Sequence, residues 1–410
     1  GGETATAAGA AGGAAGGVVG GAAAVAAAVA LGLHNGRWVP LLQRMASAAG
    51  ACARSESLWE VVCELCTIVY VGTSRAGWMA LPGPGGATQP GASDATRQAS
   101  SASREASLIL CAEVYQRHGH VCALASLADL LEDASSDAPQ AAVVRPTPAQ
   151  ALTLGARAAR VAGTIASLSQ PQVSVAVAAS MHVAASAVAQ SGSAAAEEAL
   201  LPSLRLAATI LPLHPALLCQ SDAGLDALWS LAVAPFASDE AAVDAACQHA
   251  GMALLQALLE VARQSIESAP AAAEPAMGTT PPTPRCEPAV AAVVLAVLRP
   301  RVPSLVRAMA AAVAHTAPAS AVEHASSLLH ATAATFPHEW AATLPSAVDQ
   351  LAAELARRRR PLSPEAHQLL LRGALKQPLP PVRTFNAMWH DLAQVARMGT
   401  SARALERYAR

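Results

Sequence analysis

Cysteine and histidine are the residue types in this sequence best suited to holding a metal ion. Cys63 and Cys66 have the Cys-x-x-Cys spacing of half a zinc site. The other half would have to come from Cys111, His118, His120 or Cys122, whose spacing matches no regular half-site. Cys63 and Cys66 also lie in a strongly periodic helical stretch, where free cysteine acts as a small apolar residue. We therefore expect structural thiols with no bound metal.

No other arrangement in the sequence is typical of a catalytic or cofactor site. The 12 histidines are dispersed, and none lies in an H-E-x-x-H pattern. The nearest is His338-Glu339-Trp340, which lacks a second histidine four residues after the first. The phosphate-binding G-x-x-x-x-G-K-[ST] loop and the Gly-x-Ser-x-Gly nucleophile motif are both absent. We expect a protein that is not an enzyme and has no catalytic, cofactor or metal residues.

The most concentrated charge in the chain is a run of four arginines, Arg357, Arg358, Arg359 and Arg360, followed by Pro361. Cations at a helix C-terminus are stabilising by about 0.3–1 kcal/mol each, so a solvated helix end is one interpretation. Guanidinium groups also match carboxylates and phosphates, so a docking site for acidic or phosphorylated partner segments is another. A nuclear localisation signal is a third interpretation, on four residues alone.

Composition favours an α-helical protein. The 410 residues are 53% hydrophobic but only 3% aromatic, because alanine supplies much of the apolar content. Alanine is the best helix former, and strands prefer the aromatic and β-branched residues that are sparse here. A net charge of −2 argues against a nucleic-acid-binding surface. Eight scattered cysteines indicate a reducing compartment and not a disulfide framework.

Apolar residues recur at helical spacing along most of the chain. A capping box, Ser57-Leu-Trp-Glu60, opens a helix with an expected stripe of Leu58, Val61, Val62, Leu65, Ile68 and Val69. A second capping box is Ser320-Ala-Val-Glu323. In the last third, helices are predicted to start near 287, 302, 318, 338, 363 and 381.

The spacing of those starts predicts the fold class. Alternate helices begin 31, 36, 45 and 43 residues apart, which brackets the ~40–47-residue period of HEAT repeats. Short connections force neighbouring helices to run antiparallel. We expect an all-α protein, an α-solenoid of HEAT-like antiparallel helix pairs with low-complexity insertions.

Composition also divides the chain. We expect a Gly/Ala low-complexity segment at 1–33, helical repeats at 34–267 with disordered insertions (72–103 and 133–147), a linker at 268–286, and C-terminal HEAT-like repeats at 287–410. Gly17 to Leu33 is interpreted as linker because it has few large apolar side chains. The chain starts without Met, so we interpret it as a fragment.

The C-terminal quarter, Val302 to Arg410, resembles importin-β-type nuclear transport receptors of the transportin-SR and importin-thirteen branch. VPSLVRAMAAAVAHTAPASAVEHASSLLHA is similar to a late helix pair of that branch, and FNAMWHDLAQVARMGT to its terminal helix. Two further segments carry the resemblance. One helix begins at Phe336-Pro337 with Trp340 in its first turn, and the next opens with Leu362-Ser-Pro-Glu365.

This resemblance implies a carrier of protein cargo through nuclear pores, found in cytoplasm and nucleus. Cargo would lie against the inner surface of the superhelix, with no direct nucleic-acid contact and no membrane span. The GTPase Ran would be a partner only if N-terminal repeats precede this chain. The alternative function is another α-solenoid scaffold, such as a vesicle-coat, phosphatase-regulatory or assembly adaptor.

Overall fold

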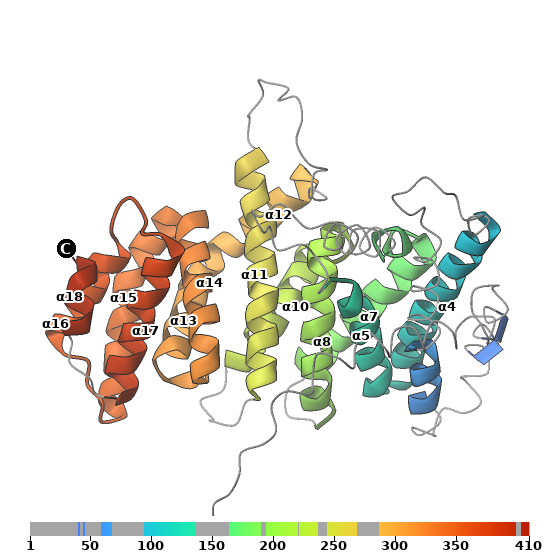
Figure 1. Cartoon of the computed structure of the whole chain (residues 1–410), viewed down its shortest axis with the longest axis horizontal. Coiled ribbons are helices and arrows are strands. Elements are labelled where there is room, and N and C mark those ends of the chain that lie inside the picture. Colours follow the sequence, from blue (N-terminus) through green and yellow to red (C-terminus); the bar gives the residue numbers. More distant parts are fainter. Residues whose placement is uncertain are drawn as a thin grey trace, which may run out of the picture. The chain divides into compact units, whose positions relative to one another are not determined.

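The computed structural model places a discontinuous set of residues, and 90% of them are helical with no β-strand (Figure 1). The expected all-α class is confirmed for this part of the chain. It separates into two compact units, Gly1–Ser180 and Met181–Arg410. The described residues are 40–41, 44–45, 59–67, 94–135, 164–189, 194–219, 221–236, 244–268, 287–398 and 403–409.

The first unit contains a helix at 59–67, α4 (Asp94–His118), α5 (Val121–Ser135), a helical turn at 164–168 and the first half of α7 (Pro171–Ala189). Helices α4 and α5 pack together across a two-residue turn. Gly119 opens that turn at φ 69, a backbone conformation that glycine adopts without strain. Gln116 on α4 donates hydrogen bonds to the Ala176 carbonyl (2.6 Å) and the Ser180 hydroxyl (3.0 Å), which join α4 to α7.

The second unit is a succession of packed helices. They are α8 (Ala194–Leu213), α9 (Pro215–Leu218), α10 (Asp222–Val233), α11 (Ala245–Ser268), α12 (Pro288–Leu298), α13 (Val302–Ala311), α14 (Val322–Thr335), α15 (Pro337–Arg357), α16 (Pro364–Ala374), α17 (Val382–Met398) and α18 (Arg403–Ala409). Short turns of helix, η3 (Ala234–Phe236), η4 (Arg299–Arg301), π-helical η5 (Ala312–Thr316) and η6 (Ala319–Ala321), connect some of them.

Proline sets several of these helix starts, which is why they could be predicted from the sequence. Pro288, Pro337 and Pro364 each occupy the first position of a helix, where the missing N–H has no partner to lose. Ser363 caps α16 by accepting a hydrogen bond from the Ala366 amide (3.1 Å). The predicted starts near 287, 302, 338, 363 and 381 lie within one residue of the observed ones, and the start near 318 corresponds to η6 leading into α14.

Each helix packs against its neighbours through one face of apolar side chains. Leu344, Val348, Leu351 and Leu355 are all buried on the inner face of α15, as their four-three-four spacing predicts. Helix α11 packs on α8, α12 and α14, α13 packs on α15, and α14 packs on α17 (Figure 1).

Helices α13 and α15 run parallel with a constant offset in sequence. Arg299, just before α13, pairs with Glu339 at the start of α15 (3.0 Å). His315, just after α13, lies 3.2 Å from Glu354 near the end of α15. The two pairs are separated by 40 and 39 residues. Helices one repeat apart are related in this way in a stacked array.

Helices α14 and α17 are related differently. Asn386 donates to Ser327 (2.8 Å), and Arg397 donates to the Ala317 carbonyl before α14 (2.8 Å). The later residue of α17 therefore pairs with the earlier part of the α14 segment, so the two helices run antiparallel. The second unit thus combines one repeat-like parallel contact with a contact that a uniform array of helix pairs would not contain.

Two boundaries differ from the sequence analysis. Residues 94–103, assigned to the insertion at 72–103, form the start of α4, and residues 133–135, assigned to the insertion at 133–147, end α5. Ala, Gln and Arg in 94–103 are good helix formers, so Ser and Thr content alone was a poor guide. The rest of both insertions, together with 1–33 and most of 268–286, lies outside the described residues.

Two local expectations were wrong. Val61 is 63% exposed, whereas Val62 of the expected stripe is buried together with Trp59, Cys63 and Cys66. Leu58, Ile68 and Val69 of that stripe lie outside the described residues. The aromatic ring decided the rotation, because burying Trp removes more apolar area than burying Val. The Ser320 capping box does not form either, since α14 has Ala321 before its first residue and no side-chain cap.

Among the residues that the structure describes, two helical stretches, Pro171–Val188 and Pro288–Thr316, are long and apolar enough to cross a membrane by length and composition alone. Packed core helices can meet the same criteria. The second stretch packs on α11 and α15, and its Arg301 pairs with Asp226 and lies over the Trp229 ring. These contacts bury about a third of the stretch, 33%, and the absence of a membrane span stays a prediction.

Candidate functional site

The arginine run closes α15 through its backbone. The Arg360 amide donates to the Leu355 carbonyl (2.9 Å) and the Arg359 amide to the Ala356 carbonyl (3.0 Å), the paired hydrogen bonds of a Schellman motif. Arg359 holds the left-handed position at φ 59, which glycine usually occupies. The helix therefore ends within the run, and successive arginines point in different directions.

The four guanidinium groups have different surroundings. Arg358 lies 3.6 Å from Glu354, one turn earlier on α15. Arg360 donates to the Arg397 carbonyl at the end of α17 (2.7 Å). Arg357 and Arg359 are exposed, and their guanidinium groups have no hydrogen bond or ion pair with any described residue. Two of the four guanidinium groups therefore interact with other described residues, and the other two face solvent.

A separate arginine, Arg397 on α17, caps the C-terminal end of the α13–η5 segment. Its Nε donates to the carbonyls of Val313 and Ala314, both at 3.2 Å. Its Nη2 donates to Ala312 (3.1 Å), Val313 (2.8 Å) and Ala317 (2.8 Å). The Ala312 carbonyl also accepts a hydrogen bond from the Ala317 amide (3.1 Å), and the cation complements the negative end of the helix dipole. Burial lowers the pKa of Arg397, and the role of this side chain is structural.

Near the run, Glu354 also faces the histidine at the end of η5. Burial lowers the pKa of His315, and the charges of Arg358 and Arg397 act in the same direction, while Glu354 opposes them. A neutral imidazole beside a carboxylate could exchange protons with it. In the described part of the chain, however, no nucleophile or further base lies next to His315 and Glu354. The pair fits a packing role between α13 and α15.

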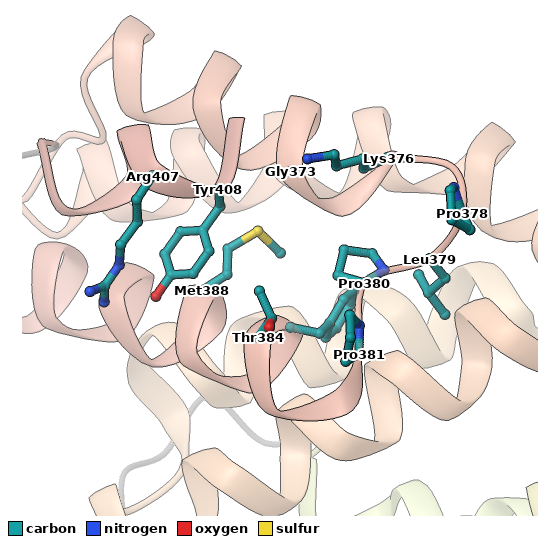
Figure 2. A pocket seen from close by; sticks show the side chains of 11 residues that line it. Gly373, Lys376, Pro378, Leu379, Pro380, Pro381, Thr384, Met388, Arg407 and Tyr408 are labelled. Carbon is teal, nitrogen blue, oxygen red and sulfur yellow. The ribbon is translucent and has the colours of Figure 1, made fainter. Parts of the chain in front are cut away.

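A pocket of about 270 Å³ lies among α16, the loop 375–381, α17 and α18 (Figure 2). Met388 and Tyr408 lie beside one another on one side, and the proline-rich loop closes the other side. The lining is mostly apolar, with Lys376 and Arg407 as its charged members. The residues that line it are Gly373, Lys376, Pro378, Leu379, Pro380, Pro381, Thr384, Phe385, Met388, Arg407 and Tyr408.

Close contacts fix the walls of this pocket. A Cβ at position 373 would lie 2.6 Å from the Met388 sulfur, so the absence of a side chain at Gly373 lets α16 approach α17. Asp391 accepts hydrogen bonds from the Tyr408 hydroxyl (2.8 Å) and from Arg407 (2.5 Å). Arg407 is thus already paired, which leaves Lys376 as the lining cation without a partner among the described residues.

The pocket and the arginine run are separate features. Thr384 and Arg397 lie at opposite ends of α17, and thirteen residues of helix span about 20 Å. The sequence analysis did not single out the pocket. The only part of the pocket that the sequence indicates is the loop Gln377-Pro-Leu-Pro-Pro381, whose prolines predict a stiff backbone. The sequence does not indicate which helices pack against this loop.

The four cysteines considered as metal ligands, Cys63, Cys66, Cys111 and Cys122, are free thiols in the structure. The Cys111 thiol lowers the pKa of Cys63, and the thiols of Cys63 and Cys66, together with burial, raise the pKa of Cys111. His118 stacks on Trp59 with ring centroids 5.6 Å apart, and its other ring neighbour is His120. Within the described ranges no group of three His, Cys, Asp or Glu residues has a geometry that could hold a metal ion.

The described part of the chain is an all-α arrangement of packed helices. Comparison with known protein families, with curated proteins and with solved structures found no match to this chain.

Proposed function

We propose that the chain is a protein-binding helical scaffold of the HEAT-like solenoid type and not an enzyme. The observation that supports this best is the parallel packing of α13 on α15, with contacts offset by 40 and 39 residues. That offset matches the length of one HEAT repeat. Stacked helix pairs expose long surfaces that bind other proteins, and they do not need a single catalytic cleft.

Within this class we propose the C-terminal part of a nuclear transport receptor that carries protein cargo through nuclear pores. The support is the resemblance of Val302 to Arg410 to that family. Ran would bind only through repeats that precede this chain. The competing scaffold functions share the fold, so only a transport measurement separates them.

The candidate partner surface is the exposed part of the arginine run. Arg357 and Arg359 carry charges that no described residue neutralises, and an acidic or phosphorylated segment of a cargo protein would complement them. The pocket beside α17 is smaller than a typical site for a small-molecule substrate, and its apolar lining suits one large side chain of a bound protein.

The first test measures binding to the arginine run. A fluorescent glutamate-rich peptide and its phosphoserine counterpart are titrated with the full chain and followed by anisotropy at low and moderate salt. Replacement of Arg357 and Arg359 by Gln should weaken binding at least about tenfold, because two charge-assisted contacts are lost. The matched control is Arg372→Gln with Arg383→Gln, which removes the same charge from exposed positions on α16 and α17. Equal loss in both double variants would contradict a specific site.

The second test measures transport. The labelled chain is added to permeabilised cells, and its nuclear accumulation is compared with that of an inert protein of similar mass. Accumulation above the inert protein supports the transport proposal. Accumulation no greater than the inert protein, together with intact peptide binding, would favour a vesicle-coat, phosphatase-regulatory or assembly scaffold.

A further inference from the structure

The proline-rich loop that closes the pocket beside α17 is fixed by contacts to α14. His330 of α14 donates from Nε2 to the Pro380 carbonyl (3.0 Å). The same imidazole meets the buried Phe385 ring edge-on, with ring centroids 5.2 Å apart. Each proline also fixes one backbone torsion of the loop. This wall of the pocket is therefore in place before any partner binds.

The other wall is built by α16, α17 and α18. Gly373 has no side chain, so α16 comes close to the Met388 sulfur. Asp391 of α17 accepts hydrogen bonds from the Tyr408 hydroxyl (2.8 Å) and from Arg407 (2.5 Å), which tie α18 to α17. The Arg407 guanidinium carbon also lies 4.9 Å from the centroid of the Tyr408 ring. Because both walls are fixed, little conformational freedom is lost when the pocket is filled.

The chemistry of the lining favours an aromatic occupant. Figure 2 shows the side chains of Tyr408 and Met388 turned toward the pocket, with the prolines across from them. Aromatic rings pack well against other rings and against methionine sulfur. Thr384 adds an exposed hydroxyl, whose lone pairs can accept the N–H of an indole. Tryptophan is the side chain that uses all of these features.

The charge of the lining favours an acidic occupant. Arg407 is already balanced by Asp391, but Lys376 is exposed and has no hydrogen bond or ion pair with any described residue. Lys376 lies at the edge of the pocket in Figure 2. A cationic ligand would be repelled there, whereas a carboxylate beside the aromatic ring would form an ion pair with the Lys376 ammonium.

We propose that this pocket binds the tryptophan side chain of an acidic segment in a partner protein, and that a carboxylate next to the tryptophan pairs with Lys376. The inference rests on the proposed protein-binding function and names the partner segment that this pocket accepts. The arginine run is about 20 Å away at the other end of α17, so the two surfaces bind independently.

The first experiment locates the bound segment. The probe is a short peptide with one tryptophan flanked by aspartates, fluorescein at its N-terminus and an amide at its C-terminus. It is added to the full chain with a carbodiimide, which joins a carboxylate to an amine with loss of water. The chain has one lysine, Lys376, so a side-chain crosslink reports that position alone. After trypsin digestion, the peptide should be found on residues 373–383, because trypsin does not cleave after a modified lysine.

The second experiment measures affinity by fluorescence anisotropy, for this peptide and for one with alanine in place of tryptophan. The tryptophan peptide should bind at least about tenfold more tightly, as expected of an aromatic anchor. Thr384→Phe places a ring in the pocket and should bring the ratio of the two affinities close to one. Thr384 is exposed, so this variant should fold, and circular dichroism checks it.

The Lys376 contact is tested by charge removal. Lys376→Gln should weaken binding of the tryptophan peptide about threefold to tenfold at low salt, and less at moderate salt. Arg383→Gln is the matched control, an exposed cation on α17 outside the pocket lining, and should change the affinity by less than about twofold.

Four results would overturn the inference. They are an affinity ratio near one in the parent chain, a ratio that Thr384→Phe leaves unchanged, displacement by N-acetyltryptophan amide at the same concentration as by the peptide, and a dimer of the chain that Thr384→Phe dissociates. The last two would show a small-molecule site and a second copy as the occupant.

Failure of this inference is distinguishable from failure of the proposed function. The glutamate-rich peptide has no aromatic residue and tests the arginine run alone. Replacement of Arg357 and Arg359 by Gln should weaken binding of that peptide but leave the tryptophan-to-alanine affinity ratio unchanged. A ratio that falls to about one in this double variant would place the tryptophan at the arginine run and contradict the pocket assignment.

Discussion

Replacing Arg397 tests the packing of the second unit most directly. Its Nε–H and two Nη2 hydrogens serve the four carbonyls that end the α13–η5 segment. A hydrogen bond from a charged donor contributes about 1.5–3 kcal/mol, and a buried carbonyl left unpaired costs about 1–3 kcal/mol. Water can reach part of this half-buried site, so the terms do not add fully. We expect Arg397→Met to lower the free energy of unfolding by about 2–4 kcal/mol.

The measurement is urea unfolding followed by tryptophan fluorescence, because Trp340 and Trp389 are buried in the same helices. Arg397→Lys keeps the charge at the helix end but reaches fewer carbonyls, so it should lose about half as much. Arg383→Met is the control, an exposed arginine on the same helix, and should change stability by less than about 0.5 kcal/mol. A loss below about 1 kcal/mol for Arg397→Met, or an equal loss for Arg383→Met, would refute this account of the cap.

Three further predictions concern single positions. Arg359→Gly should raise the free energy of unfolding by about 1 kcal/mol in urea, because glycine adopts the left-handed conformation without a Cβ clash; no gain would mean that the conformation is not strained. Gly373→Ala should cost about 1–3 kcal/mol through its contact with Met388, and less in a Met388→Ala background; additive losses in this double-mutant cycle would contradict the contact. Burial, and the nearby His249, lower the pKa of His324 below 6.5. The unfolded chain therefore binds more protons, and stability should fall as pH drops below about 6.5. His324→Gln should reduce the difference between urea midpoints measured at pH 7.5 and 5.5, and an unchanged difference would contradict this assignment.

Helix content and helix starts in the second unit follow from local sequence. Prolines at first turns, a serine cap at Ser363 and apolar residues three and four apart set α12 to α17 with errors of a few residues. The rotation of α15 was also predictable, because its stripe of leucine and valine has only one face to bury. The rotation of helix 59–67 was not, because its apolar residues cover two faces and the partner decides between them.

The candidate sites were less predictable than the helices. The arginine run was visible as sequence, but its division into two paired and two exposed side chains depends on Glu354 and on the end of α17. The pocket depends on the approach of α16 to α17 at Gly373, which no local pattern contains.

The sequence by itself determined that this protein is helical and where most of its C-terminal helices begin, because propensity, capping and amphipathic spacing act within a few residues. Only the tertiary structure decided which helices meet. Arg397 reaches carbonyls more than 80 positions away in the chain, and α14 lies antiparallel to α17. These contacts depend on how side chains of different helices fit together, and a one-turn change of register would break them without altering any local preference.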